Sequence, residues 1–285
     1  MSEVSRRTRT WFITGAGRGL GRAFARVALE RGDRVVGTVR KAGAMADLDA
    51  DHPSSVQEIL LDVRDATAVT IAVDEAAQAF DGLDIVVNNA GVGFVGAVEE
   101  LDEQQAREHF DLNVFGAMWV SRAAIPHLRA NGGGDIVQIS TVGAIGSMPM
   151  FGLYNAGKWA LEGFSEALSS EVAQFGIRVT IAQLGGFATD WAGSSMPFAT
   201  PKPEYDDLRN AVFGTSEIPW PAVDPKAPPT DADPRVAADA LIAHLLDPDR
   251  GLRVLIGDDA HVHATLAYAA RRKSYGETGG IDWPS

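Results

Sequence analysis

The sequence predicts an α/β protein built on a parallel sheet. Short runs rich in β-branched residues alternate with helix-like segments along most of the chain, which is the pattern of successive strand–helix units. The strands are almost wholly apolar, as expected for strands buried on both faces. The chain has 285 residues, of which 46% are hydrophobic, enough to bury a substantial core.

The predicted strands and helices follow one another in a regular order. Seven strands are expected at residues 10–14, 34–39, 56–63, 83–90, 134–141, 176–184 and 252–257. Helical periodicity predicts helices at residues 19–32, 66–80, 102–128, 155–175 and 234–246. These elements predict a doubly wound (Rossmann) seven-stranded parallel sheet with helices on both faces, and residues 1–285 as a single domain.

One stretch, residues 191–234, departs from this alternation. It is rich in proline and lacks strong periodicity, and it is too long for an ordinary connection. We expect a substrate-binding loop or lid inserted before the last helix and strand. A disordered insertion is the alternative, against which stand its aromatic residues Trp191, Phe198, Tyr205, Phe213 and Trp220.

Composition restricts the partners. The net charge of −13 is the wrong sign for a nucleic-acid-binding protein. The absence of cysteine excludes disulfides and thiolate metal sites, and the late histidines His244, His261 and His263 lack an acidic cluster, so no metal site is expected. No apolar run is long enough to cross a membrane, and no secretory signal is apparent. We therefore expect a cytoplasmic protein that binds a small molecule.

A glycine-rich turn joins the first strand to the first helix. Counting from Gly15, the strict G-x-G-x-x-G spacing places Leu20 at the third glycine position. The pattern G-x-x-x-G-x-G is present instead, at Gly15, Gly19 and Gly21, with Gly17 and Arg18 inside it. Glycines let a backbone approach a pyrophosphate, and a helix N-terminus favours its charge. The alternative is a structural turn without a ligand.

The end of the second strand indicates which dinucleotide would bind. An acid at this point would bond the ribose hydroxyl of NAD, but Val39 stands there and Arg40 follows. Arg40 and Arg18 would suit a 2′-phosphate, because guanidinium groups pair bidentately with phosphate. The sequence therefore favours NADP(H) over NAD(H), unless both arginines are only solvated surface charges.

With these segments, the chain resembles the short-chain dehydrogenase/reductase family over residues 9–191 and again in the final helix and strand. The matching motifs, in family order, are Thr14 to Gly21, Asp62-Val63, Asn88 to Gly91, Asn113 in "LNVFG", and Tyr154-Asn-Ala-Gly-Lys158. The resemblance, closest to ketone and hydroxysteroid reductases, implies an oxidoreductase that interconverts a carbonyl and an alcohol.

The resemblance also implies roles for single residues. Asp62 would bond the adenine amino group with Val63 beside it, and Thr189 would contact the nicotinamide carboxamide. Asn113 would hold a water in a proton relay toward Lys158; bonding backbone groups of a distorted helix is a compatible role. The residues expected to line the cofactor at the end of the fourth strand are Asn89, Ala90 and Gly91.

Two positions depart from the family pattern. Leu184-Gly185 replaces the usual Pro-Gly, which puts the geometry of the nicotinamide-side loop in question. Gly157 replaces a common serine before Lys158, at some cost in helix propensity.

Tyr154 and Lys158 form the expected acid–base pair. They are four residues apart and so share one helix face. A tyrosine is a poor base at neutral pH, and a nearby ammonium lowers its pKa by stabilising the phenolate. Both residues are also expected to bind the cofactor, and Lys158 would do so by bonding the nicotinamide ribose. Taken alone, the pair could equally be a surface feature of a helix.

A further hydroxyl is needed to polarise the carbonyl. The family places a serine 13 residues before the tyrosine, and here that position is Thr141, with Ser140 preceding it. Neighbouring strand residues point to opposite faces, so only one of them reaches the substrate. If the loop between residues 142 and 153 has the usual family length, the spacing selects Thr141. A loop of altered length would select Ser140 instead.

The substrate and the quaternary structure are less defined. An apolar ketone, aldehyde or secondary alcohol is expected, with the pocket lined by the aromatic stretch from Trp191 and by Phe94, Val95, Met148, Met150 and Phe151. The resemblance implies a homodimer or homotetramer that pairs through helices 102–128 and 155–175. A non-catalytic NADP(H)-binding sensor of the same fold remains the alternative function.

Overall fold

The computed structural model describes residues 7–189, 196–218 and 231–275. Seven parallel strands form one sheet in the order β3-β2-β1-β4-β5-β6-β7, so the predicted fold is confirmed. The strands are β1 (Thr10–Ile13), β2 (Arg34–Val39), β3 (Val56–Leu60), β4 (Ile85–Asn88), β5 (Gly134–Thr141), β6 (Ile177–Leu184) and β7 (Arg253–Ile256).

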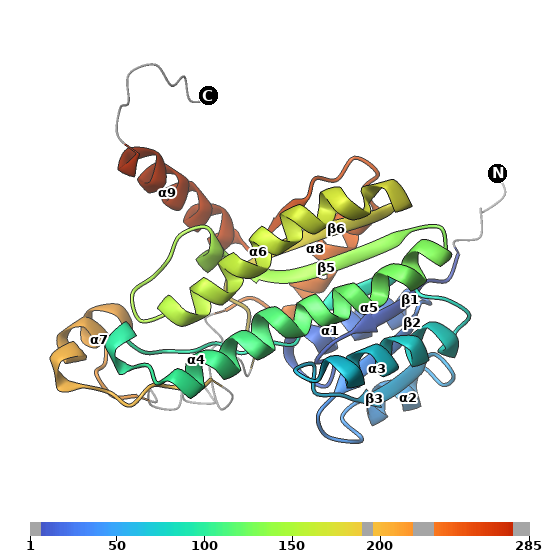
Figure 1. The fold of residues 1–285 in the computed structure, drawn as a ribbon, viewed down its shortest axis with the longest axis horizontal. Coiled ribbons are helices and arrows are strands. Elements are labelled where there is room, and N and C mark those ends of the chain that lie inside the picture. The colour runs from blue at the N-terminus through green and yellow to red at the C-terminus, as the bar shows by residue number, and fades with distance from the viewer. Residues whose placement is uncertain (1–6, 190–195, 219–230, 276–285) are drawn as a thin grey trace, which may run out of the picture.

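Helices cover both faces of the sheet (Figure 1). One core joins the sheet to α1 and α8, which pack against each other. A second core joins the opposite face to α3, α5 and α6. The helices of these two layers are α1 (Gly19–Glu30), α3 (Ala66–Ala79), α5 (Gly116–Ala130), α6 (Gly152–Val172) and α8 (Pro234–Leu246).

The strand order creates a crevice. Chain order reverses at β1, which pairs with β2 on one side and with β4 on the other. In open parallel sheets, ligands bind outside the carboxyl ends of the strands at such a point. The turns that follow β1, β2 and β4 therefore meet at one edge.

The predicted helix at 102–128 is interrupted. Helix α4 (Glu103–Phe110) passes through a π-helical turn, η2 (Asp111–Phe115), into α5. Such turns release backbone groups from their usual partners and are frequent at functional sites. The interruption contains Asn113.

Three further helices were not predicted. They are α2 (Ala46–Asp51), α7 (Asp206–Phe213) and α9 (Asp258–Ser274). α9 extends away from the sheet (Figure 1). It begins with Asp258 and Asp259 and ends with the basic run 271–273, charges that complement a helix dipole. No helix in the described ranges has the length and apolar character of a membrane span.

The described part of the 191–234 stretch is attached to the chain after β4. Phe198 forms a parallel bridge with Val95. Arg209 of α7 donates to Glu100 at 2.6 Å, and both side chains are fully buried. We call residues 95–101 and 196–213 together the β4–α7 unit; it contains η1 (Val98–Glu100) and η6 (Pro203–Tyr205). Trp191 and Trp220 lie outside the described residues.

Candidate active site

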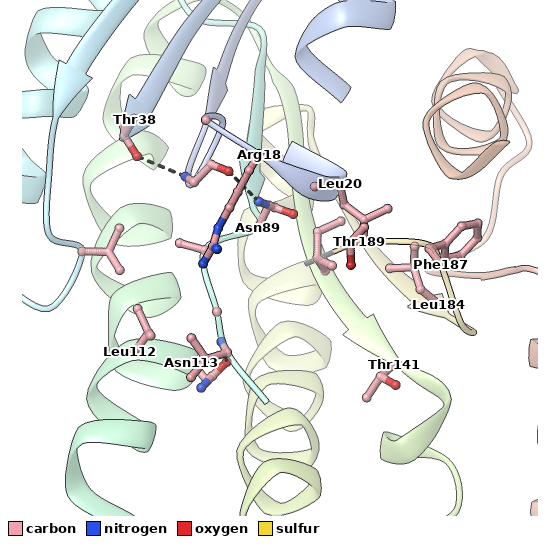
Figure 2. A pocket seen from close by; sticks show the side chains of 18 of the residues that line it. Arg18, Leu20, Thr38, Asn89, Leu112, Asn113, Thr141, Leu184, Phe187 and Thr189 are labelled. Carbon is pink, nitrogen blue, oxygen red and sulfur yellow. Dashed lines mark hydrogen bonds between the residues drawn. The ribbon is translucent and has the colours of Figure 1, made fainter. Parts of the chain in front are cut away.

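A cavity of about 570 Å³ lies along the carboxyl ends of the strands. Figure 2 shows side chains from several elements that point into it. Every residue predicted for catalysis or cofactor binding lines it except Gly21. The predicted lining residues are Gly15, Gly17, Arg18, Gly19, Leu20, Arg40, Asp62, Val63, Asn89, Ala90, Gly91, Asn113, Ser140, Thr141, Tyr154, Lys158 and Thr189.

The glycine turn is held by its neighbours. Gly15 and Gly19 have φ of 68° and 54°, a left-handed conformation that glycine adopts without strain. The backbone N–H of Gly15 donates to the Thr38 hydroxyl at 3.3 Å, and the Asn89 amide donates to the Gly15 carbonyl at 3.3 Å (Figure 2). The turn is thereby fixed against β2 and the end of β4.

Gly21 has a packing role. A Cβ at this position would lie 2.4 Å from the Gly15 carbonyl oxygen and 2.5 Å from Nδ2 of Asn89. Gly21 is buried beneath the turn rather than exposed in the cavity, so it allows the turn to sit close to α1 but does not itself contact the cavity.

The turn fits a dinucleotide. Arg18 stands at the N-cap of α1, and in the described part of the chain its side chain forms no capping hydrogen bond. Backbone N–H groups at such an end suit a phosphate. Gly17 approaches Ala44 so closely that a Cβ would lie 3.0 Å from the alanine Cβ. Free donors and a narrow glycine cradle are what a pyrophosphate requires.

The end of the cavity beside β2 is positively charged. Arg18, Arg40 and Lys41 all line it, and within the described ranges their side chains form no hydrogen bond or ion pair. Asp62 also lines it, but Arg64 Nε lies 3.0 Å from its carboxylate, and this hydrogen bond lowers the pKa of Asp62. The charges at this end therefore favour an anionic group.

Asn113 ties the π-helical turn to the loop after β4. Its Nδ2 donates to the His109 carbonyl at 3.1 Å, and its Oδ1 accepts from the Val92 N–H at 3.1 Å. Gly91 makes room for it, because a Cβ there would lie 2.6 Å from Oδ1. The side chain thus bonds backbone groups in a distorted helix, one of the two roles considered for it.

Tyr154 and Lys158 lie buried near the start of α6. Lys158 Nζ donates to the Ile139 carbonyl at 2.7 Å and lies 6.0 Å from the centroid of the Tyr154 ring. Burial lowers the pKa of Lys158 to about 8, and Glu162 opposes this shift. Burial raises the pKa of Tyr154, and a side-chain hydrogen bond with Thr141 opposes that shift.

Ser140 and Thr141 have different partners. Thr141 hydrogen-bonds the Tyr154 side chain and accepts from the Gly143 N–H at 3.3 Å. Ser140 donates instead to Glu162 Oε1 at 2.6 Å. Strand alternation separates the two side chains, as expected, and directs the threonine toward the tyrosine.

His109 was missed by sequence reasoning. Its ring is buried in edge-on contact with the rings of Tyr154 and Phe94, at centroid distances of 6.1 and 6.2 Å. Burial, and to a smaller extent Lys158, lower its pKa to about 4. The signal available in the sequence was its spacing, four residues before Asn113 on the same helix face.

An acid from α9 holds the loop that begins with Leu184-Gly185. The carboxylate of Asp259, at the start of α9, accepts from the Gly186 N–H at 2.8 Å. A Cβ at Gly185 would lie 2.0 Å from an Asp259 oxygen. This acid therefore stabilises the loop after β6. Asp231 also lines the cavity near this loop and was likewise not predicted.

Several predicted substrate contacts do not reach the cavity. Phe94, Val95 and Met150 are buried in small hydrophobic clusters, and Phe151 packs against one of them. The described apolar lining near Thr189 comes instead from Leu184 and Phe187 (Figure 2). The pattern of apolar residues gave no means of separating core from cavity.

Comparisons with known proteins agree with this geometry. Residues 9–198 match the family model described as short chain dehydrogenase. The chain is 36% identical to Oxidoreductase BOA17 of Botryotinia fuckeliana over 262 residues, covering 91% of this chain and 93% of the relative.

Solved structures show the same fold. A short-chain dehydrogenase from Streptomyces avermitilis has a TM-score of 0.84 and 35% identity, with 97% of each chain covered. One from Burkholderia cenocepacia, in complex with NADP, has a TM-score of 0.73 and 25% identity, covering 94% of this chain and 96% of that one. One from Burkholderia phymatum, in complex with NAD, has a TM-score of 0.77 and 22% identity, covering 99% of this chain and 100% of that one. The chain therefore belongs to the short-chain dehydrogenase family and is an oxidoreductase.

Proposed function

We propose that the protein is an NADP(H)-dependent oxidoreductase that interconverts a ketone or aldehyde and the corresponding alcohol on an apolar small molecule. The observation that carries this proposal is the hydrogen bond between Thr141 and Tyr154, with Lys158 beside it. These three groups lie in the cavity that the glycine turn also lines. A proton donor and a dinucleotide cradle thus share one space.

The cofactor would be held by the residues that fit it. The N-terminus of α1 and the glycines of the turn would hold the pyrophosphate, Asp62 and Val63 the adenine, and Thr189 the nicotinamide side. Arg18, Arg40 and Lys41 support NADP(H), because three cations suit a 2′-phosphate. When bound, the nicotinamide would supply or accept the hydride.

Side chains of the protein would bind the carbonyl oxygen and transfer its proton. In reduction, the carbonyl carbon gains a hydride and its oxygen gains a proton. The Thr141 hydroxyl would donate to this oxygen and stabilise its developing charge. Tyr154 would transfer its proton to the oxygen, and the Lys158 ammonium would stabilise the remaining phenolate. Alcohol oxidation would run through the same groups in reverse.

Two features support the expected substrate and assembly. Leu184, Phe187 and Val92 provide apolar surface beside the catalytic groups, which suits an apolar substrate. Phe115, which is 40% exposed, stacks on Trp119 along the α4–α5 side. An exposed phenylalanine stacked on a partly buried tryptophan at a predicted interface supports a homodimer or homotetramer.

The test is NADPH oxidation against a panel of apolar ketones and aldehydes, followed by Tyr154→Phe. The wild type should turn over at least one carbonyl, and Tyr154→Phe should abolish turnover while NADPH binding stays nearly unchanged. Tight NADPH binding without turnover across the panel would favour a non-catalytic sensor. Full turnover in Tyr154→Phe would refute the assigned mechanism.

A further inference from the structure

Glu162 joins three neighbouring strands with one buried carboxylate. From β5, Ser140 donates to it at 2.6 Å. From β6, Gln183 Nε2 donates to its two oxygens at 2.9 and 3.0 Å. From β7, Arg253 Nε lies 3.2 Å from Oε2. Ser140 and Gln183 are register partners in the sheet, so the carboxylate binds side chains that point from one face.

Glu162 also lies one helical turn after Lys158. The pair follows the i, i+4 spacing that brings side chains together on one helix face. Lys158 bonds the carbonyl of Ile139, and Glu162 bonds the side chain of the next residue, Ser140. Consecutive positions of β5 are therefore held by consecutive turns of α6.

The charged and titratable groups around the pair come from three elements. Tyr154 faces Lys158 from the same helix, and Lys158 contributes to the lowered pKa of His109 on α4. Arg253 faces Glu162 from β7 and also pairs with Glu166, an exposed acid one turn further along α6. Glu162 is thus the buried carboxylate whose charge acts on Lys158.

We infer that Glu162 is a positioning residue for the acid–base pair: it keeps Lys158 in its ammonium form and withdraws Ser140 from the substrate, leaving that role to Thr141. This inference rests on the proposed function, since it assigns Lys158 and Thr141 the roles given there. A buried ammonium is costly without a counter-charge, and the Glu162 carboxylate supplies one from within the same helix.

The central experiment is Glu162→Gln, which removes the charge and retains a hydrogen-bonding side chain of the same size. The alkaline limb of kcat/KM for carbonyl reduction should move to lower pH by about one unit, a roughly tenfold loss of rate on that side. The alkaline limb of NADPH binding should move with it, because Lys158 is expected to bond the ribose. Limbs at the wild-type position in both measurements would overturn the inference.

Two variants control for charge and for folding. Glu166→Gln removes an exposed acid from the same arginine, and its limbs should stay at the wild-type position; an equal shift there would overturn the inference by showing a general charge effect. Arg253→Gln removes the cation that pairs with Glu162. The Glu162 carboxylate should then stabilise the Lys158 ammonium more strongly, so the alkaline limb of this variant should move to higher pH. If Glu162→Gln does not fold, an unchanged limb in Arg253→Gln overturns the inference.

The pH dependence of NADPH binding distinguishes failure of this inference from failure of the proposed function. A wild type that binds NADPH but reduces no carbonyl refutes the proposed enzyme activity. In that case a shifted binding limb in Glu162→Gln still supports the Glu162–Lys158 coupling, and an unshifted one refutes it.

Discussion

Thr141 and Tyr154 share a side-chain hydrogen bond although they come from different elements, the end of β5 and the start of α6. The neighbouring Ser140 is bonded to Glu162 instead. The hydroxyl bonded to Tyr154, the proposed proton donor, is therefore that of a threonine, and the serine beside it has a different partner. Which hydroxyl polarises the carbonyl can be measured directly.

Thr141→Ala should lower kcat about 10²–10³-fold, the usual effect of removing one donor to a developing oxyanion. Ser140→Ala should lower it far less, and Thr141→Ser should restore most of the activity, because serine keeps the donor. Steady-state kinetics on one carbonyl substrate would compare the three. The assignment is wrong if Ser140→Ala is the more damaging change.

Arg40→Ala should reduce the preference for NADPH over NADH by about 10–100-fold, the loss of roughly one charge-assisted hydrogen bond. The preference is the ratio of the two cofactor affinities measured by titration. Arg31→Ala is the matched control, since Arg31 is exposed at the end of α1 and is not among the lining residues. An equal loss in the control would attribute the effect to net charge.

Carbonyl reduction should be insensitive to pH below about 8 and should decline above it. The Lys158 pKa is lowered to about 8 by burial, so the ammonium that supports Tyr154 is lost as the pH rises through that value. Tyr154 loses its proton at higher pH, because burial raises its pKa. The pH profile of kcat/KM tests this, and a rate that still rises well above pH 8 would contradict it.

His109→Gln should make the protein less sensitive to acid. The folded-state pKa of His109 is lowered from 6.5 to about 4, so its stabilising effect is fully present above pH 6.5 and is lost as the pH falls toward 4. This lowering of the pKa corresponds to up to about 3 kcal/mol of unfolding free energy. Denaturant unfolding between these pH values would measure it. The control, His261→Gln on an exposed part of α9, should retain the wild-type dependence.

Gly21→Ala should weaken NADPH binding and lower the melting temperature. Its Cβ would meet the Gly15 carbonyl at 2.4 Å, so the turn must move away from the start of α1. Gly163→Ala in α6 is the control: apart from its own helix backbone and chain neighbours, no atom of the described residues lies within 4 Å of its Cβ position, and alanine favours a helix by about 1 kcal/mol. Calorimetry and cofactor titration should therefore separate the two variants, and equal behaviour would refute the packing role.

The sheet was predictable because its evidence is local. Apolar runs such as 34–39 and 134–141 are long enough to be read as strands, and the glycines at 15, 19 and 21 mark the turn that begins the crevice. Tyr154 and Lys158 were predictable for the same reason, since four residues of helix bring them together.

The other features of the site depend on contacts between residues that are far apart in the sequence, so they could not be predicted. The sequence around Gly185 does not indicate its contact with Asp259, which lies more than seventy residues later. The Asp259 carboxylate occupies the space that a side chain at position 185 would need. Phe94 and Met150 read as pocket residues because their hydrophobicity does not show which surface they face, and both are buried in clusters with α7 or its neighbours. Glu162 was not singled out from the sequence, because its partners come from three different strands.

The β4–α7 unit gives this protein a separable region for engineering. Its apolar residues form small clusters distinct from the two cores of the sheet, and Glu100–Arg209 provides an internal attachment. Figure 1 shows α7 beside α4, away from the strands. Leu153, next to Tyr154, belongs to one of these clusters. Substitutions confined to this unit should therefore change its own packing at little expense to the stability of the seven-stranded sheet.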